Sequence, residues 1–369
     1  MSTTSIRAIA LELGVSPSTV SRALRGEGRI SQPIREKIRA AARTAGYEVN
    51  PLLAQAFSLT RQPKEQRYRE TFGLVLEFAT ETGPDYQKQV HAGAEKQAAS
   101  LACKVEPVII SGKPREHRRW SEIFDSRGIR GLLIMPRLLT RQPRLHLDWK
   151  RFAAVQISQT LWYPRNLHRV ETGAYLRIID AMHLLKKIGY RRIGMTVEAG
   201  HNRQHNGVYY AAYLLVQELL PNRERIPIFP LDAKCNEKTF YEWMKTYKPE
   251  VLIVHDYGQL GAWIQNLGLR VPEDISLFHT NVRRHDLLPE PFRSLEWTGL
   301  RWDYEGMGRR SVEMLNNLLH NGEMGLAGNP RCLQVDEYWV EGKTLSRPIT
   351  EYITPEGFLK TRAVARGNP

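Results

Sequence analysis

Residues 5–26 read Ser-Ile-Arg-Ala-Ile-Ala-Leu-Glu-Leu-Gly-Val-Ser-Pro-Ser-Thr-Val-Ser-Arg-Ala-Leu-Arg-Gly and predict two helices joined by a glycine turn. Ser5 can cap the first helix, and Gly14 stands where a helix commonly ends. Ser16 can cap the second helix, which has Pro17 in its first turn and Gly26 at its end. Apolar residues at helical spacing form the inner faces: Ile6, Ile9, Ala10 and Leu13 in the first helix, and Val20, Ala23 and Leu24 in the second.

A third helix follows, so that residues 1–48 form a small helical head. Ser31 can cap this helix, Pro33 lies in its first turn and Gly46 ends it. Its inner stripe is expected at Ile34, Ile38, Ala41 and Ala45. Three short helices, the first two joined by a tight turn, describe a helix-turn-helix unit.

The head and its second helix have the charge and side chains of a DNA-binding surface. The chain has a net charge of +14, and residues 1–46 carry eight basic and three acidic side chains. Arg22 can bind a guanine edge with two hydrogen bonds, and the other outward residues are Pro17, Ser18, Ser21 and Arg25. The hydroxyls that can bind phosphates are those of Ser16, Thr19 and Ser21. A basic three-helix bundle with no DNA role is the alternative.

The block Gly14-Val15-Ser16-x-x-Thr19-Val20-Ser21-Arg22, followed by Gly46-Tyr47 and Asn50, resembles the head of the lactose-repressor (LacI/GalR) family. The resemblance implies DNA contacts of three kinds. Phosphates would be held by Ser5, Ser16, Thr19 and Ser21. Base edges would face Pro17, Ser18 and Arg22, and the DNA backbone would lie near Arg29, Tyr47 and Asn50.

Residues 49–70 predict a hinge helix and linker, a short apolar helical stretch followed by a polar, basic run around Pro63. In relatives a leucine of this hinge enters the minor groove and kinks the DNA. The equivalent position here is Ala56, so that Leu53 or Phe57 would have to serve as the wedge. A contact within a dimer explains these two side chains equally well.

Composition narrows the class of protein further. A chain of 369 residues with 42% apolar residues predicts two or three globular domains. No apolar run approaches the ~18 residues of a membrane span, and the amino end lacks an apolar export segment. Three distant cysteines, Cys103, Cys235 and Cys332, fit a reducing cytosol and a cytoplasmic protein. The family resemblance further implies association with the bacterial nucleoid.

From residue 71 the chain alternates short apolar runs with amphipathic ones, which predicts βαβ units and parallel sheet. Eight strands are expected at Phe72–Phe78, Val105–Ile110, Gly131–Met135, Ala153–Ile157, Ile193–Val197, Ile228–Leu231, Val251–His255 and Ile275–Phe278. Helices are expected at Gln87–Leu101, Ala174–Ile188, Gly207–Leu220, Lys238–Tyr247 and Leu260–Leu267. On this pattern alone, one barrel and two open sheets both remain possible.

Four later segments are similar to the same family: 183–194, 268–276, 307–315 and 338–345. The resemblance implies an all-α head followed by an α/β, periplasmic-binding-protein-like core of two doubly wound parallel-sheet lobes. The first lobe is expected at 71–165 with 295–325 returning to it. The second is expected at 166–294 with 326–345 returning, and residues 346–369 are expected to form a loosely ordered tail.

In such a fold the chain crosses between lobes three times, and a ligand lies where the strands of the two lobes end. The residues expected to bind this effector are Tyr86, Arg137, Trp162, Arg203, Asp256, Asn281 and Trp302. Asp256 would grip a hydroxyl group, and Trp302 would pack on a sugar ring. The alternative for each aromatic residue is packing within or between lobes. His168 and Arg169, near a position where relatives carry Asp-Asn, make a sugar acid plausible.

The sequence predicts a regulator and no enzyme. It has no nucleophile elbow, phosphate loop or zinc-protease motif, so no catalytic residue and no cofactor is expected. His201 and His205 lie four apart in an expected loop with no third ligand nearby, which argues against a metal. We therefore expect a sequence-specific regulator, a repressor, that binds a near-palindromic operator as a homodimer under control of a carbohydrate effector. A regulator without effector, a two-lobed solute-binding protein and an α/β enzyme are the alternatives.

Overall fold

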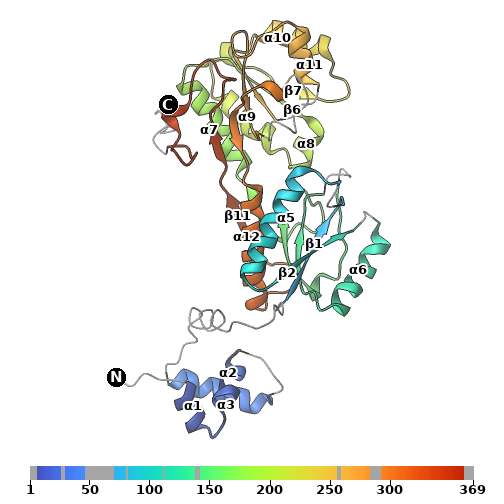
Figure 1. Ribbon diagram of the computed structural model, residues 1–369, viewed down its shortest axis with the longest axis vertical. Coiled ribbons are helices and arrows are strands. Elements are labelled where there is room, and N and C mark those ends of the chain that lie inside the picture. The colour runs from blue at the N-terminus through green and yellow to red at the C-terminus, as the bar shows by residue number, and fades with distance from the viewer. Residues whose placement is uncertain are drawn as a thin grey trace. The chain divides into compact units, whose positions relative to one another are not determined.

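The structure is a computed structural model that describes residues 6–25, 30–45, 70–79, 82–110, 113–137, 142–255, 259–282 and 292–360. The chain divides into two compact units, residues 1–67 and 68–369, and each is described by itself (Figure 1). Among the described residues no helix is long and apolar enough to cross a membrane.

The head contains α1 (Ile6–Glu12), α2 (Pro17–Arg25) and α3 (Gln32–Thr44), which confirms the expected helix-turn-helix order. Its buried core consists of Ile9, Ala10, Val20, Ala23, Ile38 and Ala42. Two details differ from expectation. Ser31 precedes α3 but its side chain makes no cap hydrogen bond. Ile34 is 43% exposed, because it lies in the first turn of α3, and Ala42 rather than Ala45 continues the buried line from Ile38.

The described part of the second unit contains two six-stranded sheets, which decides against a barrel. The first sheet has the order β11-β5-β4-β3-β1-β2 and is parallel throughout. Its strands are β1 (Thr71–Leu76), β2 (Lys104–Ile109), β3 (Gly131–Ile134), β4 (Ala153–Ile157), β5 (His168–Thr172) and β11 (Cys332–Val335). The helices of this lobe are α5 (Asp85–Ser100), α6 (Pro114–Ser126) and α12 (Tyr304–His320).

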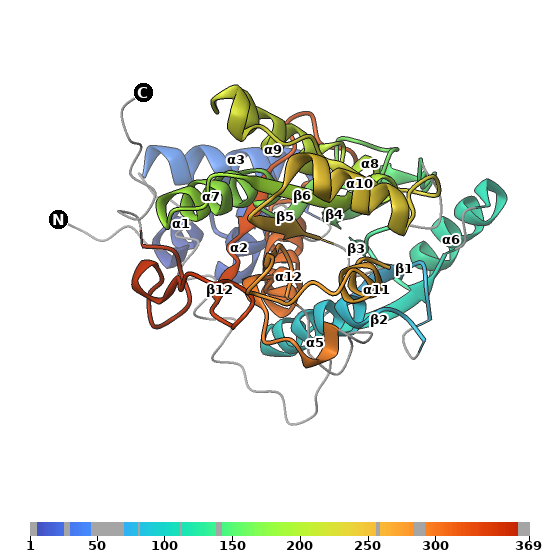
Figure 2. The same cartoon turned by 90° about the horizontal axis from the view of Figure 1, so that it is seen from above.

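The second sheet has the order β12-β10-β9-β8-β6-β7, and only its edge strand β12 is antiparallel in the described chain. Its strands are β6 (Ile193–Glu198), β7 (Phe229–Leu231), β8 (Val251–Val254), β9 (Ser276–His279), β10 (Thr298–Arg301) and β12 (Tyr338–Val340). The helices are α7 (Ala174–Lys187), α8 (Ala199–Gln204), α9 (Val208–Glu218), α10 (Glu237–Tyr247) and α11 (Leu260–Asn266). Figure 2 shows α7 and α9, which pack against each other, on this lobe.

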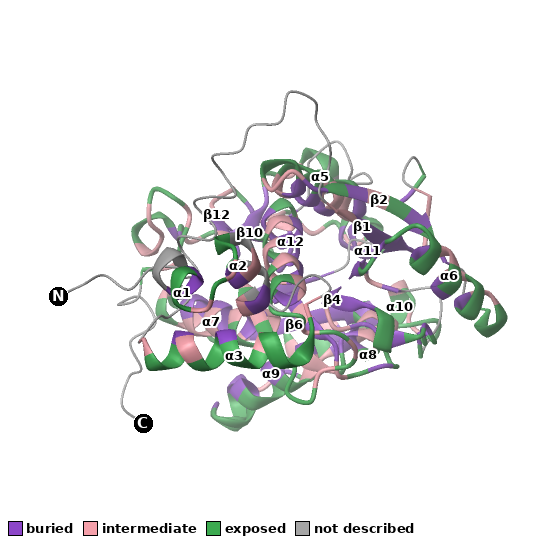
Figure 3. Ribbon diagram, turned by 90° about the horizontal axis from the view of Figure 1, so that it is seen from below, coloured by how far each residue is buried: buried purple, intermediate pink, exposed green. Residues whose placement is uncertain are grey.

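Strands buried on both faces explain the continuous apolar runs of the sequence. In β1, Phe72 and Leu74 face the cluster that α5 and α12 cover, whereas Val75 faces the opposite cluster with Phe124 of α6. The second sheet is covered in the same way, by α7 and α9 on one face and α10 and α11 on the other. Figure 3 shows the resulting buried layers in the middle of each lobe.

The chain passes between the two sheets three times within the described residues, after Thr172, after Arg301 and after Val335. This number agrees with the expected topology, but the expected lobe boundaries differ from the observed ones. Strands β5 and β11 belong to the first sheet, not the second, and β10 belongs to the second sheet, not the first. The first lobe therefore consists of residues 71–172 and of residues 304–335, where the chain returns to it. The expected boundaries missed this because β5 reads His-Arg-Val-Glu-Thr, which has one large apolar residue.

Part of the expected loose tail is packed on the second lobe. Ile349 is fully buried, and Tyr352, Ile353 and Leu359 pack against the cluster that includes α7 and α9. Residues 361–369 lie outside the described residues. The segment from 346 to 360 is therefore part of the second lobe, because its apolar side chains complete that core.

Helices α5 and α12 approach each other through two glycines. A Cβ atom placed on Gly93 would lie 2.1 Å from the carbonyl oxygen of Glu305. A Cβ atom on Gly308 would lie 2.1 Å from the carbonyl oxygen of Val90. The two backbones are therefore in direct contact, and side chains larger than hydrogen are excluded at both positions.

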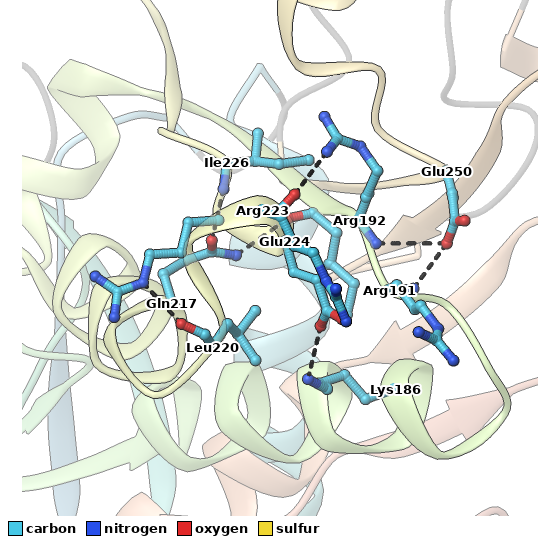
Figure 4. Close-up of polar contacts among 11 residues, drawn as sticks. Lys186, Arg191, Arg192, Gln217, Leu220, Arg223, Glu224, Ile226 and Glu250 are labelled. Atoms are coloured by element: carbon cyan, nitrogen blue, oxygen red, sulfur yellow. Dashed lines mark hydrogen bonds and ion pairs between the residues drawn. The ribbon is translucent and has the colours of Figure 1, made fainter.

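The amino ends of β6 and β8 are fixed by a polar network (Figure 4). The carboxylate of Glu250 accepts the backbone N–H of Arg191 at 2.7 Å. The guanidinium of Arg192 donates to the carbonyl oxygens of Lys248 and Arg223, at 3.0 and 2.8 Å. These bonds join three connecting segments at the amino ends of the strands.

Candidate functional site

The start of α2 is built as the sequence predicts. The N–H of Thr19 donates to Oγ of Ser16 at 3.1 Å, and the two hydroxyl oxygens lie 2.8 Å apart. Ser16 and Pro17 are exposed and Thr19 is half-buried, while Val20 and Ala23 face the core. The cap fixes the first turn of the helix at the surface of the head, which is the part of such a helix that enters the major groove.

The remaining DNA-contact predictions are not tested by this structure. The side chains of Ser18, Ser21, Arg22 and Arg25 lie outside the described part of α2. The following residues lie wholly outside the described ranges: Ser5, Arg29, Tyr47, Asn50, Leu53, Ala56 and Phe57. Their proposed contacts with DNA stay predictions.

The carboxyl edge of the second sheet, where its parallel strands finish, carries stacked imidazoles. His201 lies on α8, which the sequence analysis wrongly took for a loop, and His205 directly follows the last residue of that helix. The ring centroid of His201 lies 4.2 Å from that of His205 and 4.1 Å from that of His255. Sequence reasoning missed His255, which stands directly after β8. A third imidazole is therefore nearby, contrary to expectation.

These imidazoles pack on one another instead of converging on an ion. Nδ1 of His255 lies 2.6 Å from Oγ1 of Thr280, and Nδ1 of His205 lies 3.0 Å from the carbonyl oxygen of His201. Burial lowers the pKa of His205, which favours its neutral form. Among the described residues, no group of three or more His, Cys, Asp or Glu side chains could hold a metal ion.

Aromatic rings continue this cluster across to the first lobe. Trp302, which follows β10, lies 6.1 Å from His255 and 5.7 Å from Tyr304 between ring centroids. Tyr304 begins α12 and lies 5.9 Å from Tyr86 of α5. Such separations are typical of stabilising aromatic pairs. We call these five residues the ring strip: His201, His255, Trp302, Tyr304 and Tyr86.

Hydrogen bonds hold the middle of the ring strip in place. The indole N–H of Trp302 donates to the carbonyl oxygen of Thr280 at 3.0 Å. The side-chain amide of Asn281 donates to the hydroxyl oxygen of Tyr304 at 2.7 Å. Three of the residues predicted to bind effector, Tyr86, Asn281 and Trp302, are thus brought together, and Tyr304 is one that the sequence analysis missed.

The other predicted effector residues are placed differently. Arg137 is only 2% exposed; its guanidinium donates to the carbonyl oxygen of Ile110 at 2.8 Å and lies 3.8 Å from the carboxylate of Glu77. Burial lowers its pKa and the charge of Glu77 partly opposes this. Its Nη1 has no hydrogen-bond partner in the described chain. Arg137 is therefore held at the carboxyl ends of β1 and β2, and its contact with an effector stays a prediction.

Trp162 does not join the ring strip. Its ring is covered by the guanidinium of Arg165, 4.1 Å from the ring centroid, and its backbone N–H donates to the carbonyl oxygen of Pro143. Arg203 lies on α8 and is exposed. Asp256 lies outside the described residues, so its predicted grip on the ligand is not tested.

The basic segment before Gly173 forms a strand of the first sheet. Nε of Arg169 lies 3.1 Å from the carboxylate of Glu171, which also accepts from the thiol of Cys332 at 3.1 Å. Nδ1 of His168 accepts the N–H of Arg331 at 3.0 Å. Because β5 pairs with β11 and its charges are engaged there, this segment gives no support to a sugar acid as ligand.

A pocket of about 400 Å³ lies on the carboxyl edge of the second sheet, at the ends of β6 and β7. It is lined by Glu198, Leu231, Asp232, Ala233, Cys235, Gln259 and Trp263. A second pocket of about 550 Å³ lies in the first lobe, far from the strand ends, and Trp149, Met324 and Leu326 form its apolar walls. Both pockets fall within the usual volume of small-molecule sites, and only the first lies at the carboxyl ends of strands.

Two parts of the chain match known protein families. Residues 5–50 match the bacterial regulatory proteins of the lacI family. Residues 182–335 match the periplasmic binding protein-like domain. The first match covers the head and the second covers most of the second lobe together with α12 and β11, so both units of the chain have a counterpart.

Individual relatives agree with these matches. The HTH-type transcriptional repressor CytR of Escherichia coli strain K12 is 24% identical over 280 residues, which cover 73% of this chain and 77% of CytR. A transcriptional regulator CelR–cellobiose complex has a TM-score of 0.52 at 17% identity and covers 93% of this chain and 100% of that one. The lac repressor dimer bound to operator and the anti-inducer ONPF has a TM-score of 0.51 at 16% identity, covering 94% and 100%.

The head, the two-lobed core and their order along the chain thus agree with one family throughout. The structural neighbours support the fold, and the sequence matches support the kind of protein. The chain is a DNA-binding transcriptional regulator whose head matches the lacI family and whose core matches the periplasmic binding protein-like domain.

Proposed function

We propose that this regulator is a repressor that binds a near-palindromic operator as a homodimer. We further propose that a small ring-bearing molecule, a sugar or sugar derivative, binds between the lobes and sets the operator affinity. The observation that carries this proposal is the ring strip, which joins the carboxyl edges of both lobes in a chain that also has a helix-turn-helix head. Because an operator is part of the bacterial chromosome, we propose that the protein acts at the nucleoid.

The chemistry of the ring strip favours a neutral ligand. Aromatic faces such as that of Trp302 pack on the C–H face of a sugar ring, and such packing needs no charge on the ligand. The cation Arg137 is turned to Ile110 and Glu77 inside the first lobe, and Arg169 is paired with Glu171. That CelR was solved with cellobiose supports a neutral sugar as the first class to test.

A regulator without effector is the second candidate, since the rings of the strip already pack on one another. Thermal unfolding of the full chain against a panel of neutral sugars and sugar acids separates the two. A midpoint that rises with the concentration of one neutral sugar supports the proposal, because a ligand that binds only the folded state stabilises it. Sugar acids alone giving the rise would contradict a neutral ligand, and no rise with any compound would favour the effector-free regulator.

Replacing Asp256 by alanine should weaken binding of the effector identified in that panel by tenfold or more, about 1.4 kcal/mol. A carboxylate at Asp256, the second residue after β8, would accept two ligand hydroxyls, and alanine removes both bonds. Calorimetric titration measures the loss, with Glu242→Ala on the exposed side of α10 as the matched control. Unchanged effector affinity in the Asp256 variant would show that the ligand lies elsewhere.

Operator binding should be tight only for a dimer and should weaken steeply as salt rises. One head covers a half-site, so two heads must bind together. Each phosphate that the basic heads neutralise adds about −0.9 to the slope of log affinity against log salt. Fluorescence anisotropy over a salt series and sedimentation at micromolar concentration test both points. A monomer at that concentration, with full operator affinity, would contradict the assembly.

A further inference from the structure

Two of the three crossings between the lobes run side by side and enclose a carboxyl group. Thr172 at the end of β5 pairs in register with Val335 at the end of β11. Glu337 lies in the crossing that follows Val335, just before β12, and it is 2% exposed. A carboxylate is rarely buried so completely unless a cation is paired with it.

The cation next to Glu337 is shared with two other carboxylates. Nε of Arg177, on α7, lies 3.9 Å from Oε2 of Glu337. The same guanidinium lies 3.1 Å from Asp180 and 3.9 Å from Asp336. Arg177 is therefore closest to Asp180, and its positive charge lies farther from Glu337.

The other groups around Glu337 do not supply the positive charge that Arg177 fails to bring close. Burial raises its pKa to about 8, and the charges of Asp336 and Asp180 add to the rise, whereas Arg177 and the hydroxyl of Thr172 oppose it. Burial also raises the pKa of Asp180, with Arg177 and His183 opposing. From β10, Arg301 stacks over the ring of Tyr338, at 5.9 Å.

We propose that Glu337 is a proton-sensitive latch between the lobes: its protonation state determines which arrangement of the two lobes is favoured. In the arrangement described here its neutral carboxyl group fills the space between the two crossings. Once ionised, it favours another arrangement of the lobes, in which water reaches this crossing. A buried carboxylate without a close cation costs free energy that hydration removes, and the crossings are the covalent connections about which the lobes can move.

The sign of the effect follows from linkage. The latched arrangement holds the proton up to about pH 8, whereas a hydrated glutamate loses it near pH 4.3. Between these values the latched arrangement binds more protons, so it is favoured by low pH and loses stability relative to the hydrated one as the pH rises. The equilibrium shifts by up to about tenfold per pH unit and stops shifting above about pH 8. This inference does not depend on the identity of the effector.

Hydrogen exchange of the full chain, followed by mass spectrometry and corrected for the intrinsic rate, tests the latch between pH 6.5 and 8.5. Peptides that cover 168–180 and 332–340 report on the crossings, and a peptide over β8 serves as reference. We expect protection of the crossing peptides to fall roughly 25-fold between pH 6.5 and 8.5 in the wild type relative to the reference, because the shift continues up to about pH 8. A flat profile would overturn the proposal, and this measurement needs no variant.

Two variants sharpen the test. Glu337→Gln keeps the volume and cannot ionise, so its crossing peptides should show the same protection across the pH range. Asp336→Asn is the matched control, because that side chain is 72% exposed in the same crossing. It should keep the pH dependence, moved to slightly lower pH, because the charge of Asp336 no longer raises the pKa of Glu337. A pH dependence that persists in Glu337→Gln, or that disappears in Asp336→Asn, would show that another group is responsible.

Discussion

Replacing Gly308 by valine should lower the free energy of unfolding of the core by about 3 kcal/mol, the upper end of the usual cost of overpacking. The new Cβ atom would meet the backbone of Val90 at 2.1 Å, so no rotation of a side chain can relieve the contact. Helices α5 and α12 would have to separate along their whole line of contact. Both helices cover the same face of the first sheet, so the apolar side chains beneath them would lose their packing. Urea unfolding followed by circular dichroism measures the loss.

Gly328 offers a matched control for this experiment. A Cβ atom there would meet nothing within 4 Å, and the residue lies in the connection between α12 and β11. Gly328→Val should therefore change stability by no more than about 0.5 kcal/mol, as ordinary surface substitutions do. Equal midpoints for the two variants would show that α5 and α12 are not in backbone contact.

Arg22→Ala should weaken binding to the operator by about 1–3 kcal/mol, which is roughly 5- to 150-fold, and should relax the base preference at one position of each half-site. The reason is the bidentate bond that an arginine can make to a guanine edge and an alanine cannot. The operator must first be selected from a random duplex library. Anisotropy titrations on that operator and on a scrambled duplex then separate base reading from charge.

Arg43→Ala is the control for loss of charge. Arg43 is exposed near the end of α3, and its side chain bonds to the backbone of Arg39 in its own helix. Its removal should weaken both duplexes to a similar, smaller extent. If Arg22→Ala also weakened both duplexes equally, Arg22 would be a phosphate contact and base reading would have to be sought elsewhere on α2.

The strands with continuous apolar runs could be predicted from the sequence almost to the residue. The stretches at 131–135 and 193–197 agree with β3 and β6 to within one residue, because burial on both faces demands an unbroken apolar run. Strands β5, β10 and β11 were missed or left unplaced. Their lengths of four or five residues and their polar residues give no apolar period, and pairing with a neighbour makes them strands.

The candidate site could be predicted only where position in the topology decides contact. Asn281 and Trp302 follow strands that finish at one edge, so their meeting could be expected. Arg137 also follows such a strand, yet its long side chain turns inward to Ile110. Trp162 lies in a loop that folds back on Pro143. The direction of a side chain in a loop depends on packing with distant residues, which a local sequence pattern does not contain. The contact of His201 with His255 could not be predicted for the same reason.

The discontinuous lobes have a consequence for how the protein is made. During synthesis the head is complete once α3 has been made, whereas the first lobe needs α12 and β11, and the second needs β12 and the segment around Ile349. A ribosome must therefore reach nearly the end of the message before either lobe can close. A nonsense mutation ahead of residue 304 would release a DNA-reading head joined to two unfinished lobes. Such a fragment would keep the DNA-reading head and lose both the dimer assembly and the effector control that we propose.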